Sequence, residues 1–220
     1  MMKKFYLILI FFLSVSSISL NEKKYQFAVL KYQGGGDWYS NPSSLKNLAI
    51  FCNEKLNMNI NPNYATVDVG SLEIFNYPFI FMTGHGNVYF NNFESENLRN
   101  YLMSGGFLHI DDNYGMDQYI RKEMKKVFPE LDFIELPRSH KIYNMKYKFE
   151  NGLPKVHEHD NKRPQGMALI KNGRLVCFYS YESDLGDGWE DQEIHQNSKN
   201  KREEALKMGA NIIDYVMTNN

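Results

Sequence analysis

The stretch FIFMTGHG at residues 79–86 decides the fold of this chain. It contains an apolar run from Phe79 to Thr83, after which two glycines flank His85. A short apolar run that ends in glycine is typical of a strand buried on both faces, as in a parallel sheet covered by helices. The stretch therefore predicts a central strand that leads into a polar loop.

Strand-like and helix-like segments alternate on both sides of this stretch. Such alternation predicts a layered α/β domain with a mostly parallel sheet. Asn172-Gly173 suits a type I′ turn between two apolar runs, so a hairpin is also expected. The other expected strands are residues 26–32, 65–69, 107–110 and 132–136, the hairpin is 166–179, and the helices are 45–56, 93–103, 117–128 and 202–217.

Composition narrows the class of protein. The chain has 220 residues, with 25 lysines and arginines against 26 aspartates and glutamates, and a formal net charge of -1. A chain with no excess positive charge attracts phosphate backbones weakly, so no nucleic-acid partner is expected. The length suits one domain, which is expected over residues 21–220.

Residues 1–20, MMKKFYLILIFFLSVSSISL, have the order of a secretory signal peptide: two lysines, an apolar run and small residues. The apolar run, Phe5 to Leu13, is too short to span a bilayer comfortably, and cleavage is expected near Ser17 or Ser19. A retained N-terminal anchor is the alternative, because the small residues are serines instead of the favoured alanines. The mature protein is therefore expected to be exported, periplasmic or secreted, with no further membrane span.

Both cysteines are interpreted as buried core residues. Cys52 lies on the apolar face of an expected helix, and Cys177 lies in a strand-like run. Buried cysteine behaves as a small hydrophobe. Export permits a disulfide, and the sequence leaves open whether the two residues pair.

Polar side chains follow three of the expected strands: His85, then Asp111 and Asp112, then His140. The carboxyl ends of parallel strands face the ligand crevice, so these side chains are expected within roughly 10 Å of a common point. Two imidazoles and two carboxylates could hold a divalent metal or perform general acid and base steps. Each also has a structural interpretation, as a turn cap, as helix caps or as a partner of a backbone carbonyl.

Two details of this expected site can be checked. An extended backbone points Asp111 and Asp112 to opposite faces, and Asp112, which lies further into the loop, is expected to enter the crevice. An aspartate beside an imidazole favours the charged form of the imidazole, so a raised pKa is expected for at least one of His85 and His140.

A glycine-rich turn is expected at the same edge, and its residues Gly35, Gly36, Asp37 and Trp38 are further ligand-binding candidates. A dinucleotide-binding turn would need a third glycine where Tyr39 stands, and no Gly-Lys-Ser/Thr is present, so nucleotide binding is disfavoured. Tight turning and close backbone approach explain these glycines adequately.

Other loops carry weaker signals. Residues 180–193 are acidic and could bind calcium, but they lack EF-hand spacing and are interpreted as a solvated surface loop. The run from His157 to Asp160 has the wrong spacing for a zinc peptidase and is also interpreted as solvated, with weak metal capture as the alternative. No Gly-x-Ser-x-Gly elbow of a serine hydrolase is present. Aromatic residues expected in loops could stack on a sugar or a partner chain; these are Trp38, Tyr39, Tyr89, Tyr114 and Trp189.

Several motifs in order resemble the bacterial domain-of-unknown-function 4159 family. They are Gly34-Gly35-Gly36-Asp37-Trp38-Tyr39, Tyr77-Pro78-Phe79 through Gly84-His85-Gly86, Leu98-Arg99-x-Tyr101-Leu102 with Gly105-Gly106-Phe107-Leu108 and Asp111-Asp112, Phe128-Pro129-Glu130, and Met208-Gly209-Ala210-Asn211. The resemblance implies a flavodoxin-like three-layer sandwich, similar to class I glutamine amidotransferases and trehalose-utilisation proteins, with an added C-terminal hairpin and helix. It implies no known activity.

The same resemblance argues against one reaction. An amidotransferase has its nucleophilic cysteine at the end of the strand that here ends in Asp111-Asp112, and neither Cys52 nor Cys177 can take that place. Glutamine hydrolysis by a thiolate is therefore not expected.

Two functions remain open. The first is a ligand-binding module of the cell envelope, whose crevice around His85, Asp111, Asp112 and His140 holds a small polar ligand such as a sugar or a metal, or which binds an envelope protein. The alternative is an exported hydrolase in which the same residues, with or without a divalent metal, activate water. The fold cannot choose between them, because one fold supports many functions.

Overall fold

The computed structural model describes residues 24–219, so the expected signal peptide lies outside the described residues. A seven-stranded sheet forms the middle layer, in the order β2-β1-β3-β4-β7-β6-β5. Its strands are β1 (Tyr25–Lys31), β2 (Ile60–Asp68), β3 (Phe79–Gly84), β4 (Phe107–Asp112), β5 (Ile134–Glu135), β6 (Gln165–Lys171) and β7 (Arg174–Tyr181). The α-helices are α1 (Ser44–Leu56), α2 (Asn92–Met103), α3 (Asp117–Val127), α4 (Leu185–Trp189), α5 (Gln192–His195) and α6 (Lys199–Asn219), and the 3-10 helices are η1 (Leu72–Asn76) and η2 (Lys141–Tyr143).

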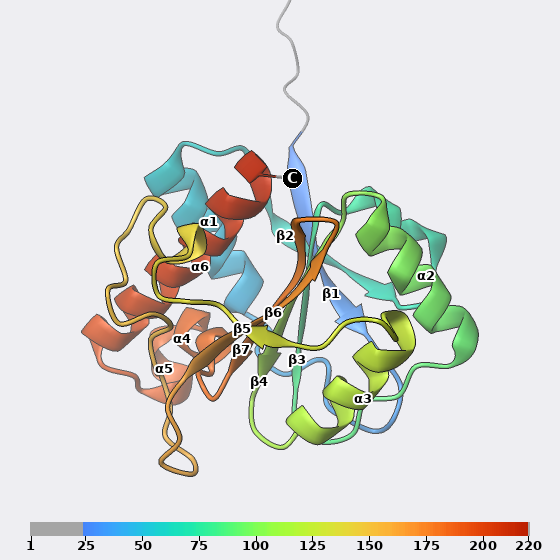
Figure 1. The fold of residues 1–220 in the computed structure, drawn as a ribbon. Helices are drawn as coiled ribbons and strands as arrows, with labels where there is room; N and C mark the ends of the chain where they lie inside the picture. Colours follow the sequence, from blue (N-terminus) through green and yellow to red (C-terminus); the bar gives the residue numbers. More distant parts are fainter. Residues whose placement is uncertain (1–23, 220) are drawn as a thin grey trace, which may run out of the picture.

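Helices cover both faces of the sheet (Figure 1). Helices α1, α4 and α6 pack together on one face, and α2 and α3 pack together on the other. Each face has its own apolar core: Phe81 and Trp189 belong to the first, and Ile80 and Leu108 to the second. The expected flavodoxin-like three-layer sandwich, with a mostly parallel sheet and a C-terminal hairpin and helix, is confirmed.

The order of the strands corrects one expectation about the sheet. β1, β2, β3, β4 and β7 are parallel neighbours along the order of the sheet, whereas β6 is antiparallel to β7 and β5 is antiparallel to β6. The expected convergence of His140 with Asp111 requires the strand at 132–136 to lie near β4, but β7 and β6 lie between them. β7 is buried from Leu175 to Ser180 and suits the sheet interior, whereas both residues of β5 are exposed and suit its edge.

The hairpin between β6 and β7 follows its expected local chemistry. Asn172 has φ 52° and Gly173 has φ 79°. A type I′ turn needs positive φ at both central residues, and Asn-Gly satisfies this with little strain. The predicted turn is confirmed, and it joins β6 to β7 as antiparallel neighbours.

The two cysteines are buried and unpaired. Cys52 lies in the core under α1, and Cys177 lies in the core on the other face of the sheet, so no disulfide joins them. Burial raises the pKa of both thiols, which favours the unreactive protonated form. The interpretation of both as core residues is confirmed.

Within residues 24–219, none of the helices combines the length and the apolar character needed to cross a bilayer.

Candidate functional site

The carboxyl ends of β1, β3, β4 and β7 lie at one edge of the sheet, because these strands run in the same direction. Thr83 at the end of β3 pairs with Asp111 of β4, and Asp111 pairs with Ser180 of β7. The loops that follow these strands therefore converge at this edge, which is where ligands bind in open α/β sheets.

The glycine-rich turn after β1 packs directly against the loop after β3. A Cβ atom at Gly36 would lie 2.7 Å from the carbonyl oxygen of Asn87, so the close approach requires glycine. Asp37 accepts a hydrogen bond from the His85 backbone N–H at 2.5 Å, and its other carboxylate oxygen lies 3.0 Å from His85 Nδ1. His85 and Asp37 thus form an exposed pair that joins two loops. A Cβ atom at Gly35 would have no described atom within 4 Å, so this glycine faces open space. Trp38 is half-buried.

Asp111 is fully buried at the end of β4. One of its carboxylate oxygens accepts hydrogen bonds from the Ser180 hydroxyl and, at 3.1 Å, from Leu185 N–H, and the other accepts from Gly186 N–H at 2.6 Å. Burial raises its pKa to about 8, against the effect of these donors. His109 Nε2 lies 2.9 Å from the same Ser180 hydroxyl oxygen. Asp111 therefore anchors the start of α4 from inside the protein.

Asp112 points to the opposite face of the sheet and caps α3. Its carboxylate accepts hydrogen bonds from the backbone N–H groups of Tyr114, Met116 and Asp117 at 2.8, 2.9 and 3.1 Å. Burial raises its pKa, although the hydrogen bonds from Met116 and Tyr114 oppose that shift. Asp112 also lines a surface pocket. Opposite orientations of the two aspartates, and a capping role for one, agree with what the sequence predicts.

His140 does not join the other candidates, so its predicted convergence with His85 and Asp111 is wrong. Its ring lies against Tyr215, at a centroid distance of 5.6 Å, near the C-terminal end of α6. The N-terminal part of α6 is the end near the site, where Arg202 contacts the loop after α4, and Tyr215 lies about 20 Å further along the helix. His140 lies away from Asp111 because the β6–β7 hairpin separates β5 from β4 in the sheet. Burial lowers the pKa of His140, contrary to the raised value considered for it.

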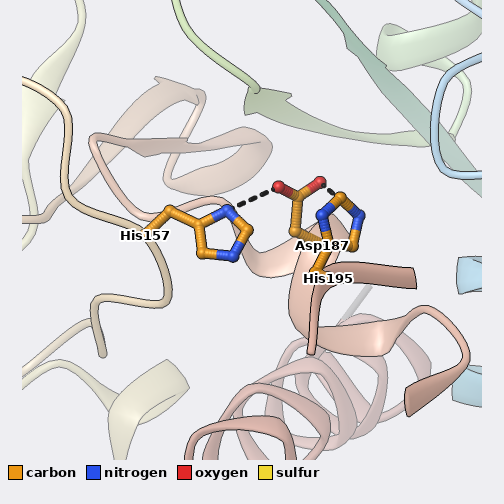
Figure 2. A group of neighbouring side chains, drawn as sticks. All are labelled: His157, Asp187 and His195. Atoms are coloured by element: carbon orange, nitrogen blue, oxygen red, sulfur yellow. Dashed lines mark ion pairs between the residues drawn. The ribbon is translucent and has the colours of Figure 1, made fainter. Parts of the chain in front are cut away.

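A different group of side chains comes together at this edge: His157, Asp187 and His195 (Figure 2). One Asp187 oxygen lies 2.7 Å from His157 Nδ1, and the other lies 3.5 Å from His195 Nε2. The hydrogen bond to Asp187 raises the pKa of His157. Burial tends to raise the pKa of Asp187, but the two histidines and the hydrogen bond from Asn41 outweigh burial and hold that pKa below its usual value. We call these three residues the His–Asp cluster.

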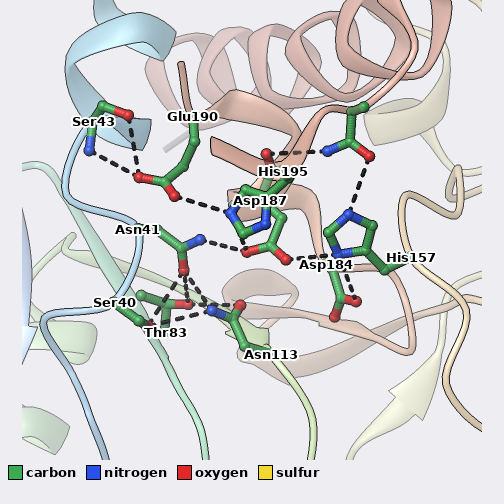
Figure 3. A network of polar contacts seen from close by, with 12 residues as sticks. Ser40, Asn41, Ser43, Thr83, Asn113, His157, Asp184, Asp187, Glu190 and His195 are labelled. Carbon is green, nitrogen blue, oxygen red and sulfur yellow. Dashed lines mark hydrogen bonds and ion pairs between the residues drawn. The ribbon is translucent and has the colours of Figure 1, made fainter. Parts of the chain in front are cut away.

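A network of amide and carboxylate groups holds the His–Asp cluster in place (Figure 3). The Asn41 side chain donates to Asp187 at 2.5 Å, and its oxygen accepts from Thr83 at 3.0 Å and from Asn113 at 2.6 Å. Asn41 has φ 61°, and its side chain connects Thr83 of β3, Asn113 after β4 and Asp187 of α4. These contacts fix which amide atom faces Asp187.

Glu190 orients the second histidine of the His–Asp cluster. One of its oxygens lies 3.0 Å from His195 Nε2, and the other accepts from both the backbone and the hydroxyl of Ser43 at 3.1 Å. Glu190 is buried, although residues 180–193 were expected to be a solvated loop. Glu182 and Asp184 are also buried, and that interpretation of the acidic segment is therefore wrong. The segment forms α4, whose Trp189 is buried and not in a loop as expected.

Asp184 lies beside the His–Asp cluster. Its side chain is 1% exposed, and one oxygen lies 2.6 Å from His159 Nε2 and 3.8 Å from His157 Nδ1. Its other oxygen is buried and has no hydrogen-bond partner among residues 24–219. Burial and the charge of Asp187 raise its pKa to about 7. The run from His157 to Asp160, expected to be solvated, thus contributes two histidines to buried carboxylates.

A pocket of about 240 Å³ adjoins Asp184 and opens between α3 and the β7–α4 loop. Its acidic lining consists of Asp112, Asp117, Asp160, Glu182 and Asp184. Its other polar groups include Tyr114, His159, Lys162 and Tyr181. The Tyr114 ring stacks on His159 at a centroid distance of 4.6 Å. Of the four crevice residues expected from the sequence, only Asp112 lines this pocket, and it is joined there by Tyr114, one of the loop aromatics expected to stack on a ligand.

Comparison with protein-family models gives one match, to "Domain of unknown function (DUF4159)", over residues 26–217. The chain belongs to the DUF4159 family. The matched residues extend from β1 to α6 and include every side chain of the His–Asp cluster and the pocket. No curated protein matches the chain.

The DUF4159 domain carries one sequence signal that points to the residues missed above. Of the six histidines in the chain, His157 and His159 precede the acidic segment at 180–193, and His195 follows it closely. Strands β6 and β7 separate His157 and His159 from most of the acidic segment and from His195 in sequence. These residues meet only in the folded protein, where β7 lies beside β4 in the sheet interior.

Proposed function

We propose that this DUF4159 domain binds a small, uncharged, hydroxyl-rich ligand of the sugar class in the pocket beside Asp112. The observation that carries the proposal is the pocket itself, about 240 Å³ in volume, placed at the carboxyl edge of the sheet and lined by many polar groups. Ligand pockets for drug-sized molecules are larger, roughly 300–1,000 Å³, so this one suits a monosaccharide-sized molecule.

The charges of the lining support an uncharged ligand. Five carboxylates face or border the pocket, while Lys162 is its one lysine or arginine among the described residues. Such a lining repels anions, but carboxylate oxygens are good acceptors for ligand hydroxyl groups. The phenol groups of Tyr114 and Tyr181 add donors and flat apolar surface, which sugars use for stacking.

Backbone strain supports a functional role for the same pocket. Tyr114, Glu182 and Asp184 all line it, and all have positive φ, at 101°, 57° and 58°. Such conformations are uncommon for residues other than glycine and cost of order 1–3 kcal/mol each where sparsely populated. The surrounding structure holds Tyr114 in place through the hydrogen bond from its N–H to Asp112.

Tyr114→Gly tests the proposal without a folding defect, because glycine adopts φ 101° more readily than tyrosine. We expect glucose, galactose or N-acetylglucosamine to bind the parent protein and to bind Tyr114→Gly at least about tenfold more weakly, since the aromatic ring is lost. Isothermal titration calorimetry measures the affinity, and Tyr39→Ala, an exposed aromatic outside the pocket, is the matched control. Equal binding by the parent and Tyr114→Gly, or no binding of any of the three sugars, would contradict it.

A metal-dependent hydrolase is the second candidate, and one observation favours it. Asp184 lines the pocket and also lies 3.8 Å from a ring nitrogen of the His–Asp cluster. A ligand in the pocket would therefore sit next to the group of side chains best suited to activate water. Turnover of a bound sugar would distinguish this enzyme from a binding module.

Export of the domain is part of the proposal and rests on residues 1–20. Their order of charged, apolar and small residues supports removal by a signal peptidase. We expect a mature N-terminus between Ser16 and Glu22 when the full chain is produced in a secreting host. N-terminal sequencing and intact mass measure this, and an uncleaved chain in the membrane fraction would instead support the anchor.

A further inference from the structure

We propose that His157, Asp187 and His195 bind one divalent transition-metal ion, such as Zn²⁺. This site lies beside the proposed sugar pocket but does not depend on it. Each residue offers one ligand atom, and the three atoms lie within 4.8 Å of one another. Donor atoms of a tetrahedral zinc centre are about 3.3 Å apart, given Zn–N distances near 2.0–2.1 Å. In Figure 2 the two imidazole rings lie on either side of the Asp187 carboxylate, so the three donor atoms need to move inward by no more than about 1.5 Å to reach this spacing.

The type of donor selects the class of metal. Two imidazoles with one carboxylate are typical ligands of zinc and of non-haem iron, whereas Mg²⁺ and Ca²⁺ prefer sites made of oxygen atoms. Three protein ligands also leave a fourth position open. Glu190 Oε2, which lies 3.0 Å from His195 Nε2, is within reach of that position.

Two of the three residues, His157 and Asp187, already have the outer hydrogen bonds that metal ligands need. A metal-bound histidine usually makes a hydrogen bond through its other ring nitrogen, which fixes its tautomer. His157 Nε2 lies 3.1 Å from Asn197 Oδ1, and the Asn197 amide donates to the Asp187 backbone oxygen at 3.4 Å, which orients the amide. His157 Nδ1 is thereby directed at Asp187. On the other side, Asn41 holds one Asp187 oxygen.

Buried charge gives independent support. Asp184 and Asp187 share His157 as a partner, Asp187 and Glu190 share His195, and no lysine or arginine of residues 24–219 forms an ion pair with any of these three side chains. The Asp184 side chain is 1% exposed; its Oδ2 lies 3.8 Å from His157 Nδ1, and its Oδ1 is buried with no partner among those residues. Their only ion-pair partners among those residues are histidines, which are also metal ligands, so a divalent cation would find both carboxylates and imidazoles at this place.

The test measures zinc binding by the purified protein after dialysis against a chelator, in competition with a chromogenic chelator. We expect one Zn²⁺ per chain, and at least about 100-fold weaker binding by Asp187→Asn and His195→Ala, which remove a ligand. Asp187→Asn keeps an oxygen for the bond from Asn41, and His195 lies on the partly exposed α5, so both variants should fold. Circular dichroism of the metal-free proteins checks this.

Two further variants separate this site from surface histidines and from the pocket. Asn197→Ala removes only the positioning residue and should weaken zinc binding about 10–100-fold. His85→Gln removes the exposed histidine that pairs with Asp37, and zinc binding should be unchanged. Tyr114→Gly should also bind zinc normally, whatever it does to sugar binding. Equal zinc affinity in the parent and Asp187→Asn, or no zinc bound by the folded parent protein, would overturn the proposal.

Discussion

Trp189→Ala is expected to lower the free energy of unfolding by about 3–5 kcal/mol, the usual cost of truncating a buried tryptophan. Trp189 is fully buried between α4, the sheet and α6. Its ring lies 5.3 Å from that of Phe81 and 5.5 Å from that of His109, and its indole N–H donates to the Ala205 carbonyl at 2.8 Å. The substitution leaves a cavity, removes the indole hydrogen bond to the Ala205 carbonyl and weakens the packing of α4 against α6.

Urea denaturation followed by circular dichroism measures this effect, because fluorescence would lose one of only two tryptophans. Trp189→Phe is the matched control: it keeps an aromatic ring and loses the N–H, so a smaller decrease in the free energy of unfolding is expected. Asp187 and Glu190 flank Trp189 in sequence, so Trp189→Ala should also weaken zinc binding. A loss of stability below about 1 kcal/mol, typical of surface substitutions, would contradict the assigned packing.

His109 should make the protein sensitive to acid. It is fully buried among aromatic rings, and burial lowers its pKa to about 3 from an ordinary value of 6.5. Because the folded-state pKa lies below the unfolded one, the unfolded chain binds a proton first as the pH falls. Stability is therefore lost between pH 6.5 and 3, at roughly 1.4 kcal/mol per pH unit.

His109→Gln isolates this effect, since glutamine keeps an amide donor for the Ser180 hydroxyl and does not titrate. Between pH 7.5 and 4.5, the parent should lose about 2–3 kcal/mol more unfolding free energy than the variant. Asp111 acts in the opposite direction, because its raised pKa of about 8 favours the folded state as the pH falls below that value. Asp111 is present in both proteins and cancels in the comparison. A difference between the two proteins that does not change with pH would contradict the assignment.

Local sequence patterns predicted most elements of the fold. The apolar run ending in Gly84 gave a central strand, and Asn172-Gly173 gave the hairpin turn, because each pattern depends on residues close together in the chain. The strand order was predicted less well. The position beside β4 went to β7, since burial of long apolar strands is decided by competition among segments far apart in sequence.

The sequence by itself determined the layered architecture, the edge at which polar loops meet, and the opposite orientations of Asp111 and Asp112, which follow from the two-residue repeat of a strand. Only the tertiary structure decided which polar groups meet there. His157 meets Asp187 and His195, from the far side of the hairpin, because β7 returns to the sheet interior and Trp189 packs α4 against α6. Charged residues that look solvated in sequence are buried here, because histidines and amides from distant parts of the chain form hydrogen bonds with them. The local spacing of the charged residues does not reveal these partners.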